Sequence, residues 1–183
     1  MLKINNKNVI KGMNINELED WCESLGEKKY RAKQIFNWLY NNHIVDGVFL
    51  SNIPDSIKKV MTDDILETLE ISKITSSKSE KTTKILYKTH DAYSIESVSM
   101  IVDNRHTVCV SSQVGCNVGC TFCATALMGL KRNLYCGEIL DQISNIIAIT
   151  QTPITNIVFM GMGEPFLNYK NVLKACEILH HPN

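Results

Sequence analysis

The chain has 183 residues, which is enough for one domain, or for a small domain and part of another. Hydrophobic residues make up 44% and charged residues 21%, a composition that excludes wholesale disorder. Basic and acidic residues balance at 19 each, so overall charge does not mark a nucleic-acid binder. No stretch approaches the roughly 18 apolar residues of a membrane span, and no secretory signal is visible. We therefore expect a cytoplasmic protein with no membrane partner.

The start of the chain, up to about residue 70, is predicted to be helical from apolar residues at helical spacing. The first predicted helix contains Ile15, Leu18, Trp21, Cys22 and Leu25, and Gly26 is placed to end it. A second carries Ala32, Ile35, Phe36 and Leu39, and a third begins near Pro54 and continues through Ile57, Val60, Met61 and Ile65. The aromatic residues of these helices are expected in the core. The basic cluster Lys28, Lys29, Arg31 and Lys33 has two interpretations, a phosphate contact or a solvated helix face.

From about residue 71 the pattern changes to short runs rich in β-branched and aromatic residues. They predict strands over 71–75, 83–89, 94–102 and 106–112, and a cysteine-rich loop over 113–133. A helix over 137–150, an apolar strand over 156–160 that is buried on both faces, a loop over 161–165 and a helix over 169–179 follow. This order of strand, loop and helix predicts the start of a parallel α/β barrel or open sheet.

Seven cysteines form the most informative feature of the sequence. The number is odd, and Cys116, Cys120 and Cys123 follow one another as C-x3-C-x2-C, which favours a metal site or redox chemistry over a secreted disulfide framework. Thiolates are the ligands that iron–sulfur clusters prefer, and three of them leave one iron of a four-iron cluster open to a substrate or cofactor. A structural zinc site remains an alternative, with a fourth ligand from Cys136, Cys109 or a histidine.

The C-x3-C-x2-C motif after a predicted first barrel strand, with Phe122 before the last cysteine, resembles the radical S-adenosylmethionine (SAM) superfamily. The segment Gly161-Met162-Gly163-Glu164-Pro165 is similar to the glycine-rich strand-end motif of that superfamily, which contacts the amino group of the cofactor. The resemblance implies a [4Fe-4S] cluster held by the three cysteines, with SAM bound through Phe122, Gly163 and Glu164. Cleavage of SAM then gives a 5′-deoxyadenosyl radical.

A narrower resemblance comes from the segments CVSSQVGC (109–116), KRNL (131–134), MGMGEP (160–165) and YRAKQIFNW (30–38). Together they are similar to the adenine-C2 methyltransferases of 23S ribosomal RNA, whose members can also modify transfer RNA. The resemblance implies that Cys109 releases a covalent protein–RNA adduct by forming a disulfide with a methyl-carrying cysteine, and that Glu96 takes the C2 proton. It also implies an electron donor such as flavodoxin or ferredoxin.

The residues support these two roles unequally. Alternation places Glu96 on a strand face with Val98 and Met100, where a partly buried carboxylate is suited to accept a proton. Without the resemblance, Cys109 is also consistent with a small, buried strand residue that has no catalytic role. The alternatives to a C2 methyltransferase are an adenine-C8 methyltransferase, another radical SAM enzyme, and a non-catalytic zinc or RNA-binding module.

The predicted organisation has three parts. Residues 1–70 form a helical accessory domain, residues 71–104 a β-rich connecting segment, and residues 105–183 the start of a radical SAM barrel. A barrel needs several more strand–helix units than follow Cys123, and no residue matches the methyl-accepting cysteine. We therefore expect a truncated, N-terminal half of such an enzyme, which binds a cluster poorly by itself and methylates nothing.

Overall fold

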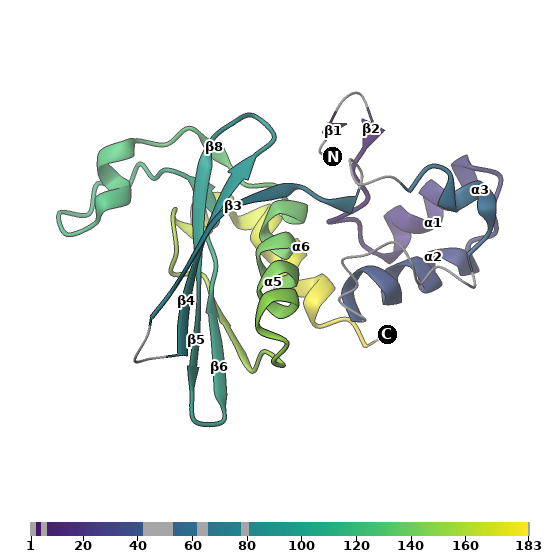
Figure 1. The fold of residues 1–183 in the computed structure, drawn as a ribbon. Coiled ribbons are helices and arrows are strands. Elements are labelled where there is room, and N and C mark those ends of the chain that lie inside the picture. The colour runs from purple at the N-terminus through teal and green to yellow at the C-terminus, as the bar shows by residue number, and fades with distance from the viewer. Residues whose placement is uncertain (1–2, 5–6, 42–52, 62–65, 78–80, 183) are drawn as a thin grey trace.

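The computed structural model describes residues 3–4, 7–41, 53–61, 66–77 and 81–182. The chain forms a helical N-terminal part and an α/β part in which helices pack against one face of a sheet (Figure 1). Near the N-terminus, the two-residue strands β1 (Lys3–Ile4) and β2 (Lys7–Asn8) pair antiparallel. Within the described residues, no helix combines the length and the apolar character that a membrane crossing requires.

The first two helices of the N-terminal part follow the predicted pattern, whereas the third is shorter than expected. It ends at Lys58, and Val60, predicted on its buried face, is 38% exposed. The helices are α1 (Ile15–Ser24), α2 (Tyr30–Phe36), the π-helical turn η1 (Asn37–Asn41) and the short α3 (Asp55–Lys58). Asn14 caps α1 in a capping box with Glu17, which satisfies backbone N–H groups at the helix start. The apolar residues predicted for the first two helices are buried or half-buried, and Ile65 lies outside the described residues.

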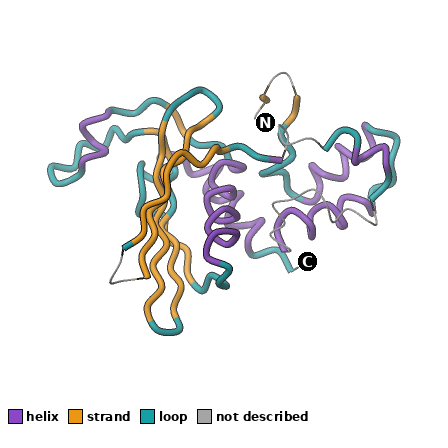
Figure 2. The backbone as a smooth tube through the Cα atoms, viewed as in Figure 1, coloured by secondary structure: helices purple, strands orange, loops and turns teal. Residues whose placement is uncertain are grey.

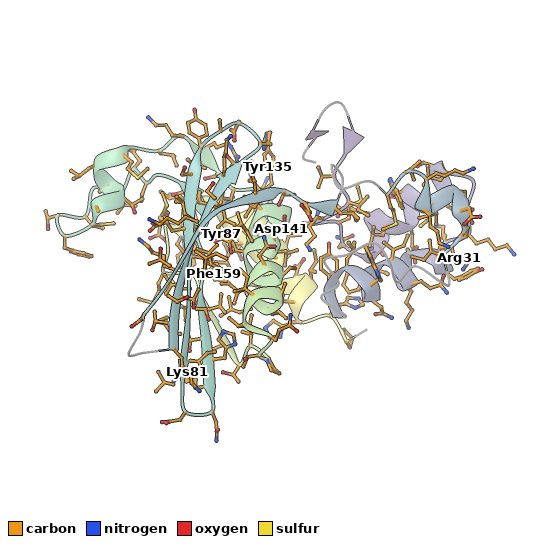
Figure 3. The ribbon with its side chains drawn as sticks, viewed as in Figure 1. Arg31, Lys81, Tyr87, Tyr135, Asp141 and Phe159 are labelled. Carbon is orange, nitrogen blue, oxygen red and sulfur yellow. The ribbon has the colours of Figure 1, made fainter. Side chains whose placement is uncertain are left out.

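The basic cluster of the helical part is partly engaged in surface ion pairs. Lys29 lies 3.7 Å from Glu23 and 4.0 Å from Glu19, with more than half of its side chain exposed. Arg31 stacks over the ring of Tyr30 and lies at the end of the molecule away from the sheet (Figure 3). These contacts fit the interpretation of a solvated helix face.

A five-stranded sheet forms the centre of the α/β part. Its order is β3 (Leu69–Ser76), β4 (Lys81–Thr89), β5 (Ser94–Val102), β6 (Arg105–Cys109) and β9 (Asn156–Val158). The first four strands run antiparallel, and β6 pairs with β9 in parallel. Helix α5 (Cys136–Thr150) makes the crossover between β6 and β9, so the expected first strand–helix–strand unit of a barrel is present.

The two faces of the sheet differ in cover. Helices α5 and α6 (Tyr169–Leu179) pack on one face, and the described residues place no α-helix on the other (Figures 1 and 2). On β5, Ile95, Ser97 and Ser99 are buried toward the helices, whereas Glu96 and Val98 on the opposite face are only half-buried. Tyr87 of β4 points toward α5, and its hydroxyl donates to the Gln142 carbonyl over 3.3 Å (Figure 3).

The helical part contacts α5 through a buried polar cluster. Asp141 accepts hydrogen bonds from the backbone and hydroxyl of Thr68, at 2.5 and 2.7 Å, and lies 3.3 Å from the Lys11 ammonium. Gly12 adopts a φ of +92°, and a Cβ atom there would lie 2.5 Å from the Gly137 nitrogen. The first residues of α5 therefore fit closely against the N-terminal segment.

Two expectations differ from the structure. The strand expected over 156–160 ends at Val158, and its residues are half-buried, with Met160 80% exposed. The prediction of burial on both faces is wrong because β9 is an edge strand in the described chain, with β6 as its one neighbour. In addition, the boundary expected near residue 104 lies in the turn between paired strands β5 and β6, so one sheet spans it. The three-part division remains a prediction.

Candidate functional site

The cysteine motif lies on a loop, residues 115–131, that leaves the sheet after β6. Two short antiparallel strands close the base of this loop, β7 (Gln113–Val114) and β8 (Arg132–Asn133). Gly115 has a φ of +74°, and a Cβ atom there would overlap the Gly129 carbonyl oxygen, so the two sides of the base touch. In Figure 1 the loop extends away from the sheet and carries the short 3-10 helix η3 (Ala124–Met128).

The three motif cysteines differ in exposure along this loop. Cys116 is buried at the base, Cys123 is half-buried and Cys120 is exposed. A hollow of about 360 Å³ in the loop is lined by Cys120 and Cys123 but not by Cys116. Hydrogen bonds from the backbone of Ala126 and Thr125 lower the pKa of the Cys123 thiol, which favours the thiolate.

The donor set fits an iron–sulfur cluster because all three side chains are thiols on one glycine-containing loop. Among the described residues, no three His, Cys, Asp or Glu side chains are already gathered as a metal site. Phe122, predicted to contact the cofactor, is 91% exposed on the loop and lines the same hollow. The structure therefore places these four residues on one loop without bringing the thiols together.

The glycine-rich segment after β9 lies directly beside the start of the cysteine loop. The Met162 carbonyl accepts hydrogen bonds from the Ser112 and Gln113 backbones, at 2.8 and 3.1 Å. Gly163 has a φ of +98°, and a Cβ atom there would lie 2.5 Å from the Gln113 Cβ. The Glu164 backbone donates to Gln113 Oε1 over 2.8 Å. Hydrogen bonds therefore join the glycine-rich segment to the residues at the base of the cysteine loop.

The Glu164 carboxylate itself has a structural contact. Its Oε1 accepts a hydrogen bond from the Phe166 backbone over 3.1 Å and caps the 3-10 helix η4 (Pro165–Asn168). The other carboxylate oxygen is not used in this cap, so the side chain retains acceptor capacity for an ammonium group.

Glu96 and Cys109 lie on the same face of the sheet. Cys109 pairs with Val98 in the β5–β6 register, and alternation places Glu96 on the face of Val98. Diagonal neighbours of this kind are about 7–8 Å apart. The Glu96 carboxylate is 42% exposed and lies 3.0 Å from the Lys84 ammonium on β4. Burial raises the pKa of the Cys109 thiol, and a hydrogen bond from the Met160 backbone opposes that shift.

Several polar residues that connect these elements were not singled out from the sequence. The Ser111 hydroxyl donates to the Glu96 carbonyl over 2.6 Å and accepts from the Met162 backbone over 2.9 Å. The Gln142 side chain of α5 binds both backbone groups of Ser111, at 2.8 and 3.0 Å. The Asn168 amide donates to the Ser112 and Leu134 carbonyls. A run of polar residues, SSQ, directly before the cysteine motif was the available signal.

Comparison with known proteins agrees with this arrangement. Residues 8–66 match the family model described as the ribosomal RNA large subunit methyltransferase N-terminal domain, and residues 110–182 match that of the radical SAM superfamily. The crystal structure of a radical SAM methyltransferase from Sphaerobacter thermophilus superimposes with a TM-score of 0.88 at 38% identity, over 96% of this chain and 53% of that one.

Curated relatives narrow the assignment. A probable dual-specificity RNA methyltransferase RlmN of Geobacillus kaustophilus is 39% identical over 94% of this chain and 48% of its own length. A protein of the same name from Caldicellulosiruptor saccharolyticus is 41% identical over 95% of this chain and 50% of its own length.

The cysteine loop, the mixed α/β fold and these matches define a protein of the radical SAM superfamily. Within the superfamily, the chain belongs to the family of the RlmN dual-specificity RNA methyltransferases. The chain spans about half the length of the curated relatives it matches.

Proposed function

We propose that the complete protein is a radical SAM methyltransferase that methylates C2 of an adenosine in 23S ribosomal RNA, with transfer RNA as a second substrate. One observation carries this proposal. Glu96 and Cys109 share a sheet face, and Ser111 connects the Glu96 strand to the glycine-rich segment beside the cysteine loop. The names of the relatives support an RNA substrate, and the resemblance to the C2 branch supports the position of methylation.

The proposed cofactors are a [4Fe-4S] cluster and SAM. Cys116, Cys120 and Cys123 would hold the cluster, Gly163 and Glu164 would contact the SAM amino group, and Phe122 would approach the cofactor from the cysteine loop. When bound, the two cofactors supply a 5′-deoxyadenosyl radical by one-electron cleavage of SAM. The electron requires a reduced partner such as flavodoxin or ferredoxin, and the RNA substrates place the reaction in the cytoplasm.

In this scheme Glu96 acts as the general base. The C2 proton of the adenine moves to the Glu96 carboxylate, which has to be ionised to accept it. Lys84 lies 3.0 Å from that carboxylate and orients it on the open face. The Glu96 side chain is 42% exposed on this face, so an adenine that is drawn out of its RNA stack can approach the carboxylate without movement of the sheet.

In the same scheme Cys109 is the thiol that releases the adduct. Its thiolate sulfur forms a bond to the sulfur of the methyl-carrying cysteine, and the bond from that sulfur to the transferred carbon breaks. The electron pair of the broken bond stays with the carbon, which takes up a proton to become the methyl group of the product. No residue of this chain is assigned as the methyl-carrying cysteine. Because burial raises the pKa of Cys109, the thiol keeps its proton until a base removes it at the release step.

Mass spectrometry of RNA from cells that express the complete gene tests this proposal, in a host without its own adenine methyltransferase. We expect 2-methyladenosine in 23S ribosomal RNA and in transfer RNA, and its loss in the Cys109→Ala and Glu96→Gln variants. A product methylated at C8 would assign the chain to the related adenine-C8 enzymes. Unmodified RNA from a folded, cluster-loaded protein would contradict the proposal.

A further inference from the structure

One arginine links the base of the cysteine loop to two other elements of the fold. Arg132 lies on β8, where it pairs with Val114 across the base of the loop, two residues before Cys116. The β7–β8 ladder has only two residue pairs, supported by a backbone hydrogen bond of 2.9 Å from Lys131 to Val114. Such a short ladder cannot fix a long loop by itself, so the base depends on further contacts. The Asn168 amide bridges the Ser112 and Leu134 carbonyls, Gln113 donates to Asn133, and Arg132 reaches elements outside the ladder.

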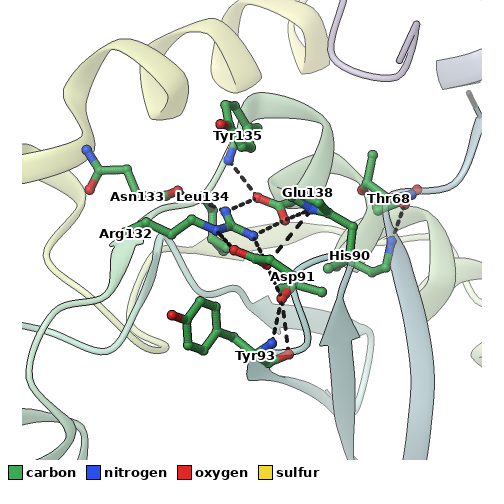
Figure 4. Close-up of polar contacts among 12 residues, drawn as sticks. Thr68, His90, Asp91, Tyr93, Arg132, Asn133, Leu134, Tyr135 and Glu138 are labelled. Atoms are coloured by element: carbon green, nitrogen blue, oxygen red, sulfur yellow. Dashed lines mark hydrogen bonds and ion pairs between the residues drawn. The ribbon is translucent and has the colours of Figure 1, made fainter. Parts of the chain in front are cut away.

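All donors of the Arg132 guanidinium have partners (Figure 4). Two N–H groups bind Asp91 at 2.7 and 2.8 Å, and two bind Glu138, both at 2.7 Å. A fifth contact of 3.0 Å reaches the Asn133 carbonyl. A planar guanidinium can bridge two carboxylates in this way, whereas a lysine ammonium cannot present two such forks.

The two carboxylates belong to separate elements. Asp91 lies in the turn between β4 and β5, where it also accepts from the Thr89 hydroxyl over 2.6 Å. Glu138 lies in the first turn of α5, its side chain is fully buried, and it also accepts from the Tyr135 backbone over 2.8 Å. Arg132 therefore ties the base of the cysteine loop to both the sheet and the crossover helix.

We propose that Arg132 is a positioning residue that fixes the base of the cysteine loop and thereby the three thiols for cluster binding. This inference rests on the proposed function, because it assumes that the loop binds an iron–sulfur cluster. Only Gly115 separates Cys116 from strand β7, so movement at Arg132 displaces the first thiol relative to the other two. Outer contacts that orient metal ligands commonly change metal retention by about 10- to 100-fold.

The test compares three variants of the complete protein with the unaltered complete protein. Arg132→Lys keeps the positive charge beside Glu138 but removes the paired hydrogen bonds to the two carboxylates. Asp91→Asn weakens only the hydrogen bonds to the β4–β5 turn. Arg105→Lys is the matched control, because Arg105 is exposed at the other end of β6 and donates from Nε to Asn156. Hydrogen exchange of residues 113–133 is measured without metal. The rate of iron removal by a chelator and the electron paramagnetic resonance spectrum are measured after anaerobic reconstitution.

We expect faster exchange across residues 113–133 in Arg132→Lys, with iron lost about 10-fold faster and a broadened cluster spectrum. Asp91→Asn should show a smaller change in the same direction, and Arg105→Lys none. Exchange and iron loss equal to those of the unaltered protein, even with a lower melting temperature, would overturn the inference, because Arg132 would then only stabilise the fold. An unaltered complete protein that takes up zinc and no iron would instead contradict the proposed function.

Discussion

Replacement of Ser111 by alanine tests how strand β5, which carries Glu96, is held to the glycine-rich segment that contains Met162. The Ser111 hydroxyl is fully buried and makes two hydrogen bonds, to the Glu96 carbonyl at 2.6 Å and from the Met162 backbone at 2.9 Å. Its loss leaves the Met162 N–H without this partner, at a cost of about 1–3 kcal/mol, and removes one bond from the carbonyl. We expect a total loss of about 2–3 kcal/mol in the free energy of unfolding.

Ser112 provides a matched control for this substitution. Its side chain is also buried, yet among the described residues its hydroxyl has no hydrogen-bond partner. Ser112→Ala should therefore leave stability unchanged or raise it. For a chain of this size the Ser111 variant should melt about 4–12 °C lower, measured by circular dichroism. Equal melting temperatures for the two variants would refute the assignment of Ser111 as a connector between strand β5 and the glycine-rich segment.

Three further predictions concern other parts of the site and its support. Gly163→Ala forces a φ of +98° on a residue with a Cβ and brings that atom against Gln113, so the free energy of unfolding in denaturant should fall by at least about 1–3 kcal/mol. Unchanged stability would mean that residue 163 does not have this backbone conformation beside Gln113. Alkylation followed by peptide mass spectrometry should label Cys123 at lower pH than Cys109, because hydrogen bonds lower the first pKa and burial raises the second. Labelling of Cys109 at a lower pH than Cys123 would contradict both pKa shifts. Asp141→Asn leaves the buried Lys11 ammonium without its anion and should lower the free energy of unfolding in urea by about 3–5 kcal/mol. A loss under about 1 kcal/mol would show that the Asp141–Lys11 pair is not buried.

Local sequence patterns predicted those elements whose signal lies within a few residues. Alternation along 94–102 located β5 and the face of Glu96, and apolar spacing located α5 and α6 nearly to the residue. The C-x3-C-x2-C spacing identified the loop, because ligand spacing is a local property of the chain.

Long-range pairing could not be predicted in the same way. No local pattern showed that β5 continues through a hairpin into β6, so that a mostly antiparallel sheet carries the parallel pair β6–β9. The partners of Arg132 lie 41 and 6 residues away, and those of Ser111 lie 15 and 51 residues away. Such contacts depend on the assembled fold, so the chain gives no local signal for them beyond an excess of polar residues beside the motif.

Metal analysis of the anaerobically reconstituted chain tests the central claim most directly. If Cys116, Cys120 and Cys123 hold an iron–sulfur cluster, the chain should contain iron and acid-labile sulfide in equal amounts, even at low occupancy. Reduction should give a cluster signal by electron paramagnetic resonance, and replacement of the three cysteines by serine should abolish it. Stoichiometric zinc without sulfide, lost in the same triple variant, would contradict the account and indicate a structural metal site.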